Sequence, residues 1–98
     1  MIYTVNISSR ARRQLRNVPL HIVRKLAGWV ISVEEKSIEE VRKIPGYHDE
    51  PLTGARKCQR SIRLSISYRA VYQIRKDETT QREAIEFVSV EEVTRHKY

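Results

Sequence analysis

The chain has 98 residues, of which 40% are apolar, and its 19 basic and 12 acidic residues give a formal net charge of +7. This length suits one domain around a single core, spanning residues 1–98, and the apolar fraction excludes a chain that is disordered throughout. The sequence has no apolar run near the roughly 20 residues of a membrane span, no secretory-signal layout and a single cysteine, so it predicts a cytoplasmic protein without an internal disulfide or a membrane partner.

The first elements predicted along the chain are a strand and a short basic helix. Residues 2–7 (IYTVNI) alternate apolar and polar side chains, which is typical of a strand with one buried face. Ser8 or Ser9 can cap the helix that follows, because a serine hydroxyl accepts a hydrogen bond from a free backbone N–H at a helix start. Apolar residues at helical spacing, surrounded by arginines, predict that this helix ends near Asn17.

A second helix and a shorter third one follow. Pro19 suits the first helical position, and the apolar stripe after it continues to Val33, where it loses its phase. Ser37 with Glu40 three residues later matches the capping-box pattern, which predicts a third helical piece over 37–43. Together the helices are expected to form an antiparallel hairpin or a close variant of one.

The second half of the chain is predicted to form a loop and three strands. The loop, residues 44–57, contains two prolines and two glycines, and a connection of this length in a compact domain is often functional. Strands are predicted at 59–66, 68–76 and 84–90, followed by a tail with one turn of helix at most. The order βααβββ predicts an α+β fold, in which a helical hairpin packs on one face of a small, mainly antiparallel sheet and the other face stays open.

Basic residues are concentrated in two blocks of the sequence. Residues 1–33 carry six basic and no acidic residues, and residues 54–76 carry seven basic and no acidic residues. Arginine outnumbers lysine 13 to 6, and its planar guanidinium suits two-point contact with phosphate. The blocks indicate a polyanionic partner, either nucleic acid or an acidic protein. A solubilising surface without a ligand is the alternative, and it fits the first block better than the second, whose cations occupy strand positions.

Two arginines are expected to meet on the open face of the sheet. Alternation along a strand separates Arg63 from its apolar neighbours Ile62, Leu64 and Ile66, which should point into the core. If the hairpin pairs its strands in register, Arg63 approaches Arg69. Two adjacent guanidiniums repel unless an anion lies between them, so this pair predicts an oxyanion or phosphate site. The alternative is that each arginine pairs with a carboxylate such as Glu86.

Three motifs in the second half suggest a family. They are "EPL-x-G" at 50–54, "RSIRLS-x-SYRAVY" at 60–72 and the terminal "HKY". In this order and spacing, and in a chain of this length, they make the sequence resemble the RelE/ParE superfamily of bacterial type II toxins, most closely its RelE/YoeB/HigB-like branch. The resemblance covers nearly the whole chain. It implies the microbial-RNase-like RelE/ParE fold and an antitoxin protein that holds the toxin inactive.

Two activities are implied by this resemblance. RelE-type members are endoribonucleases that need no metal or other cofactor, and many of them cut mRNA in the ribosome, which implies mRNA and the ribosome as partners. ParE-type members share the fold, lack the nuclease residues and inhibit DNA gyrase. The RelE-type activity is the prediction, and gyrase inhibition is the alternative. A basic nucleic-acid-binding module without toxicity is a third possibility that composition alone allows.

The resemblance also implies a set of site residues. Carried over by motif, the catalytic residues are Glu50, Arg63, Arg69 and Tyr98. The C-terminus departs from the family pattern, because Lys97 stands before the terminal tyrosine where some relatives have histidine, and His96 precedes it. We therefore include His96 in the predicted catalytic set. The predicted RNA-binding residues are His48, Arg56, Lys57, Arg60 and Lys97.

Cleavage of RNA by its own 2′-hydroxyl defines what these residues have to do. A base removes the 2′ proton, cations stabilise the crowded phosphorane and an acid protonates the leaving 5′ oxygen. Arginine stays protonated and suits the second task. Glu50, His96 or His48 can transfer protons, Lys97 needs a strongly depressed pKa to do so, and Tyr98 can stack on a base. The plainer alternatives are a solvated loop for Glu50 and His48, and a packed or frayed tail for His96 and Tyr98.

Overall fold

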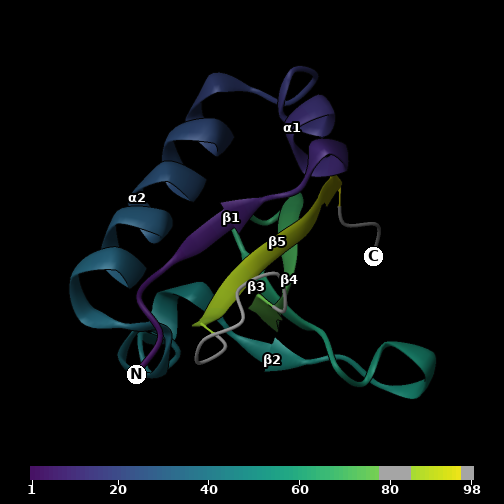
Figure 1. The fold of residues 1–98 in the computed structure, drawn as a ribbon. Coiled ribbons are helices and arrows are strands. Elements are labelled where there is room, and N and C mark those ends of the chain that lie inside the picture. Colours follow the sequence, from purple (N-terminus) through teal and green to yellow (C-terminus); the bar gives the residue numbers. More distant parts are fainter. Residues whose placement is uncertain (78–84, 96–98) are drawn as a thin grey trace.

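The computed structural model describes residues 1–77 and 85–95, and Figure 1 shows how their elements are arranged. The helices are α1 (Ser9–Leu15), α2 (Leu20–Lys36) and α3 (Ile38–Val41). The strands are β1 (Val5–Ile7), β2 (Glu50–Pro51), β3 (Arg60–Arg63), β4 (Tyr68–Asp77) and β5 (Ile85–Arg95). Single turns of 3₁₀ helix at Pro45–Tyr47 and Gly54–Arg56 flank β2.

The strands form one mixed sheet in the order β1-β5-β4-β3-β2. β1 runs parallel to β5, and the other neighbouring pairs are antiparallel. The long helix α2 lies along one face of this sheet (Figure 1). The predicted α+β fold, with helices on one face of a small and mainly antiparallel sheet, is confirmed. β2 is an additional short strand inside the predicted 44–57 loop.

Ser8 and Gln14 fix α1 to the edge of β5. The Ser8 hydroxyl accepts a hydrogen bond from the Ala11 amide at 3.0 Å, so the predicted cap is present. The Ser8 amide donates to the carbonyl of Val90 at 2.9 Å, and the Gln14 side-chain oxygen accepts from the Val93 amide at 2.7 Å. α1 therefore satisfies backbone groups of β5 beyond the point where β1 ends.

Ser37 forms the joint between α2 and α3. α2 continues to Lys36, nearly one turn beyond the predicted limit at Val33, and the Ser37 amide donates to the Val33 carbonyl at 2.8 Å. The Ser37 hydroxyl accepts from the Glu40 amide at 3.4 Å. Only this half of the predicted capping box forms, because the Ser37 amide is already bound to Val33; the Glu40 carboxylate pairs with Lys43 at 3.3 Å instead. None of the helices described is long and apolar enough to cross a membrane.

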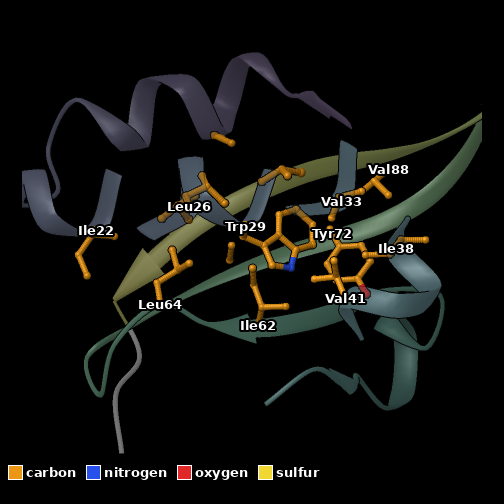
Figure 2. Close-up of a cluster of buried hydrophobic side chains, with 14 of the residues drawn as sticks. Ile22, Leu26, Trp29, Val33, Ile38, Val41, Ile62, Leu64, Tyr72 and Val88 are labelled. Carbon is orange, nitrogen blue, oxygen red and sulfur yellow. The ribbon is translucent and has the colours of Figure 1, made fainter. Parts of the chain in front are cut away.

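The core lies between α2 and the helix-facing side of the sheet, and Figure 2 shows its central side chains. Trp29 of α2 and Tyr72 of β4 are both fully buried, with ring centroids 5.3 Å apart and ring planes tilted by 48°. Around them pack Ile22, Leu26, Val33, Ile38, Val41, Ile62, Leu64 and Val88. Each fully buried large apolar side chain contributes about 1.5–3 kcal/mol of transfer free energy, so this layer is the main source of the fold's stability.

The C-terminal strand is longer than predicted. The expected one-turn tail after Val90 is instead a continuation of β5 to Arg95. The register of β4 against β5 shifts at this point, leaving Glu91 as an extra residue between Val90 and Glu92. Such a bulge places two successive side chains on the same face. It therefore puts both glutamates on the open face and returns Val93 to the core.

The strand predicted at 59–66 is shorter than expected. β3 ends at Arg63, and residues 64–67 form bends. The Ser65 hydroxyl accepts hydrogen bonds from the amides of Ser67 at 3.1 Å and Tyr68 at 3.2 Å, which is the local bonding that favours a turn over a strand. The prediction that Ile66 points into the core is wrong, since it is 74% exposed.

Candidate functional site

The arginine pair predicted from the alternation is present at the β3–β4 hairpin. Arg63 and Arg69 are direct partners across the two strands, so the expected register is confirmed. Ile62, next to Arg63, is buried in the core, which directs the Arg63 side chain to the opposite, open face. Directly opposite residues have their Cβ atoms about 4.5–5.5 Å apart, so both guanidiniums emerge from one small area.

Neither charge of this pair is neutralised within the described residues. The ion pairs found there involve other basic residues, and the Nε of Arg69 is buried without a hydrogen-bond partner. The alternative partner Glu86 lies opposite Lys76, whereas Arg69 lies opposite Thr94. The eight residue steps from Glu86 to Thr94 span roughly 25 Å of strand. A buried donor without a partner is unfavourable, so this position suits an anion.

A cleft of about 200 Å³ opens beside the pair. Its polar lining consists of His48, Glu50, Ser61, Arg63, Ser65 and Arg69. Its apolar lining includes Leu52, Ile66 and Tyr68. Sites for drug-sized ligands have volumes of about 300–1,000 Å³, so this cleft suits a smaller group, such as a phosphate with part of a nucleoside. The structure thus brings together four predicted site residues and adds two serines that the sequence did not single out.

β2 presents Glu50 at the rim of the cleft. Glu50 is the direct partner of Ser61 in β3, which also lines the cleft, and its side chain is exposed. The loop before β2 carries His48, which is also exposed. The cleft therefore combines two cations with one carboxylate and one imidazole, which are the groups that anion stabilisation and proton transfer require.

Arg60 does not lie in the cleft. It is the direct partner of Tyr72 and so shares the helix-covered side of the sheet. Its Nε donates to Oδ1 of Asp49 at 2.6 Å, and the Asp49 side chain is 1% exposed. The Tyr72 hydroxyl donates to Oδ2 of Asp49 and accepts from Nε of Arg42 at 3.3 Å. Arg60 therefore lies apart from the cleft with its charge engaged inside the fold, and its role in RNA binding stays a prediction.

This buried cluster changes the ionisation of its members. Burial and the hydrogen bond to Asp49 raise the pKa of Tyr72 well above its ordinary value, although Arg42 opposes the increase. Burial lowers the pKa of Arg60, but the hydrogen bond and charge of Asp49 outweigh it and raise the pKa overall. Asp49 was not singled out from the sequence. The signal that could have found it is the presence of Arg60 and Tyr72 on an inward-facing set of positions, since buried polar groups need partners.

Arg56 and Lys57 also lie away from the cleft. Arg56 pairs with Glu92 at 2.6 Å, and the second oxygen of Glu92 is 3.4 Å from Arg10. A separate depression contains these three residues, and Lys57 is exposed next to Arg56. The bulge that turns Glu92 to the open face thus neutralises part of its positive charge.

The remaining predicted site residues lie outside the described part of the chain. They are His96, Lys97 and Tyr98. Within the described residues, no three side chains of the metal-binding types gather as a group that could hold a metal ion.

The chain is similar to several solved toxin structures. No family model matches it, and among curated proteins none matches it significantly. The YoeB/ParE toxin from Agrobacterium tumefaciens superposes with a TM-score of 0.65 at 14% identity, over 96% of this chain and 99% of that one. A chain of the RelBE2 toxin–antitoxin complex of Mycobacterium tuberculosis superposes with a TM-score of 0.57 at 26% identity, over 98% of this chain and 100% of that one. A chain of the Escherichia coli DinJ–YafQ complex superposes with a TM-score of 0.64 at 16% identity, over 97% of this chain and 94% of that one.

Proposed function

Because the chain has the fold of the RelE/ParE toxins, we propose that it is the toxin of a type II toxin–antitoxin system and acts as a metal-independent mRNA endoribonuclease. The observation that carries the proposal is the Arg63–Arg69 pair, whose charges are not neutralised within the described residues and which shares a cleft with Glu50 and His48. A toxin that only blocked a protein partner would not need two repelling guanidiniums at this position.

The cleft suits a cleavage in which RNA supplies its own nucleophile. The 2′-hydroxyl attacks the adjacent phosphorus, and the bond from phosphorus to the 5′ oxygen breaks. Products are a 2′,3′-cyclic phosphate and a 5′-hydroxyl. Arg63 and Arg69 hold the non-bridging oxygens, whose charge increases in the transition state. Glu50 accepts the 2′ proton, and His48 is the second group in the cleft that can transfer a proton, which the leaving 5′ oxygen must gain.

Expression in a bacterial host tests this function against its alternative. Induction of the wild type should stop growth and create new mRNA 5′ ends within translated codons, while an Arg63→Ala/Arg69→Ala double variant should do neither. Purified protein with mRNA, with and without ribosomes, then shows whether cleavage requires translation. Intact mRNA together with gyrase-dependent DNA breaks would refute the nuclease and favour the ParE-type activity.

The same proposal includes an antitoxin as the partner. Two of the similar solved structures are toxin–antitoxin complexes, and the net charge of +7 favours an acidic partner. We expect an acidic segment with an amphipathic helix to cover the positive surface and the helices.

A further inference from the structure

Residues 47–50, which lead into β2, alternate between side chains that are anchored to the fold and side chains that line the cleft. Tyr47 is half-buried against the core, and the ammonium of Lys25 lies 4.9 Å from the centre of its ring. Asp49 is held by the buried cluster described above. His48 and Glu50 are exposed and line the cleft. Two anchored residues therefore alternate with the two residues of the segment that can transfer protons.

The backbone at His48 indicates that the anchors work against local preference. His48 has φ 46° and ψ 49°, the left-handed conformation that side chains other than glycine adopt infrequently. Its amide donates to the Pro45 carbonyl at 3.1 Å. A conformation of this kind persists where the surrounding contacts determine it. The surrounding contacts here are those of Tyr47 and Asp49, on either side.

Asp49 is the stronger of the two anchors. One carboxylate oxygen binds Arg60 of β3, and the other binds Tyr72 of β4, which in turn accepts a hydrogen bond from Arg42 at the end of α3. Three elements thus converge on one buried carboxylate. A buried charge that loses a partner is strongly unfavourable. The Asp49 carboxylate is therefore fixed between its partners, and it fixes the neighbouring backbone with it.

We propose that Asp49 is a positioning residue, which holds His48 and Glu50 at the Arg63–Arg69 pair without contacting RNA. The proposal rests on the proposed nuclease function for the meaning of that geometry, but the holding of the segment is a structural property that can be measured by itself. The competing explanation is that Asp49 only stabilises the fold as a whole. The two differ in where the chain loosens when the carboxylate charge is removed.

The test is Asp49→Asn in the full chain, compared with Glu91→Gln as the matched control. Like Asp49, Glu91 accepts a hydrogen bond from a strand arginine, in this case Arg75 of β4 at 2.9 Å, but Glu91 lies outside the cleft. Amide hydrogen exchange is followed at His48 and Leu52, whose amides donate to the carbonyls of Pro45 and Gln59. In Asp49→Asn these amides should exchange at least about tenfold faster than in the wild type, with β4 and β5 unchanged. The control should alter neither region.

Kinetics on RNA add a readout that a general loss of stability would not produce. Misplacement of catalytic groups by about 1 Å can cost about 10²-fold in rate, so kcat of Asp49→Asn should fall by about 10- to 100-fold, with KM within about twofold of the wild type. If Asp49→Asn does not fold, Tyr72→Phe removes one donor and leaves the Arg60 contact, and the same effects should appear at smaller size.

Two results would overturn the proposal. One is unchanged exchange at His48 and Leu52 together with unchanged kcat, and the other is faster exchange spread evenly through β4 and β5. A wild-type protein that cleaves no RNA would defeat the proposed function instead, and the exchange data would still decide whether Asp49 holds the segment.

Discussion

At the scale of single residues, the cleft brings two positive side chains together in an arrangement that does not stabilise the fold. Arg63 and Arg69 are direct cross-strand partners, and like charges in that arrangement destabilise a sheet by up to about 1 kcal/mol. Arg75 on the same face pairs with Glu91 at 2.9 Å. Within the described residues, β4 thus carries one arginine in an ion pair, Arg75, and one without, Arg69, and the proposed function assigns only the second to the site.

This contrast predicts opposite outcomes for the two kinds of arginine. Arg63→Ala and Arg69→Ala should each lower RNA cleavage by about 10²–10³-fold, the effect of losing one preorganised electrostatic group. Their free energies of unfolding in urea should equal or slightly exceed that of the wild type, because a repulsion is removed. Arg75→Ala, the control, should keep normal cleavage. Loss of folding in both cleft variants, or full activity in a folded double variant, would show that the arginines do not form the site.

The hydroxyl of Tyr72 predicts a dependence of stability on alkaline pH. Burial and Asp49 raise the pKa of Tyr72 in the folded protein above its ordinary value of 10.0. A raised folded-state pKa means that its contribution is complete below about pH 10 and is lost as the pH rises further, because the unfolded chain ionises first. Relative to the wild type, Tyr72→Phe should be less stable near pH 7 by about 1.5–3 kcal/mol, the range for a hydrogen bond to a charged group. The difference in free energy of unfolding should shrink from pH 10 to 12, and a constant difference would contradict this assignment.

At the scale of elements, the joint between α2 and α3 combines a cap with backbone strain. Ser37 is fully buried, has φ 85° and ψ 156°, and caps α3 through its hydroxyl. That backbone region is essentially restricted to glycine and costs other residues about 1–3 kcal/mol. Loss of a serine cap to alanine costs about 1 kcal/mol. The serine therefore offsets part of the strain with a hydrogen bond.

The order of stability of glycine and alanine variants at this joint should therefore be the reverse of the order inside a helix. Inside a helix glycine is less stable than alanine by about 0.5–1 kcal/mol, whereas at a helix cap glycine is preferred to alanine. At position 37, Ser37→Gly relieves the strain, while Ser37→Ala keeps the strain and loses the cap. We expect Ser37→Gly to be more stable than Ser37→Ala by at least about 1 kcal/mol in urea unfolding. Greater stability of the alanine variant would mean that the backbone at Ser37 is not strained.

At the scale of the whole molecule, charge determines how fast a partner arrives. The net charge is +7, and a field of this sign would steer an acidic partner, such as the proposed antitoxin, towards the protein before contact. Glu91 and Glu92 neutralise some of the open face through Arg75, Arg56 and Arg10. Among residues 1–77 and 85–95, no ion pair engages the cleft arginines.

Association with the antitoxin should therefore depend on salt. The association rate constant measured by stopped flow should fall by about tenfold or more between about 50 and 500 mM NaCl, because the Debye length shrinks over this range. Arg16→Glu, on the exposed end of α1 and outside the cleft, should lower the low-salt association rate by reducing the net charge, and should leave RNA cleavage unchanged. Equal association rates at both salt concentrations would show that steering plays no part.

Local patterns in the sequence were enough to predict much of this protein's structure. The caps at Ser8 and Ser37, the apolar stripe of α2 and the opposition of Arg63 and Arg69 were all predictable, because each depends on residues a few positions apart or on one hairpin register. Glu50 was chosen by motif and His48 by its place in the loop two residues earlier, and the structure brings both to that pair. Their catalytic roles stay predictions.

Tertiary contacts decided the features that local patterns could not contain. Asp49 meets Arg60 and Tyr72, 11 and 23 residues further along the chain, so its burial depends on how β2, β3 and β4 align. The bulge in β5 exists because Val90 and Val93 must both reach the core while α1 holds the strand edge. In the same way, Arg60 is close in sequence to the cleft residue Arg63, but the register of β3 against β4 places it opposite Tyr72, on the helix-covered side of the sheet. Strand alternation is local, but which face is covered depends on helices far away in the chain.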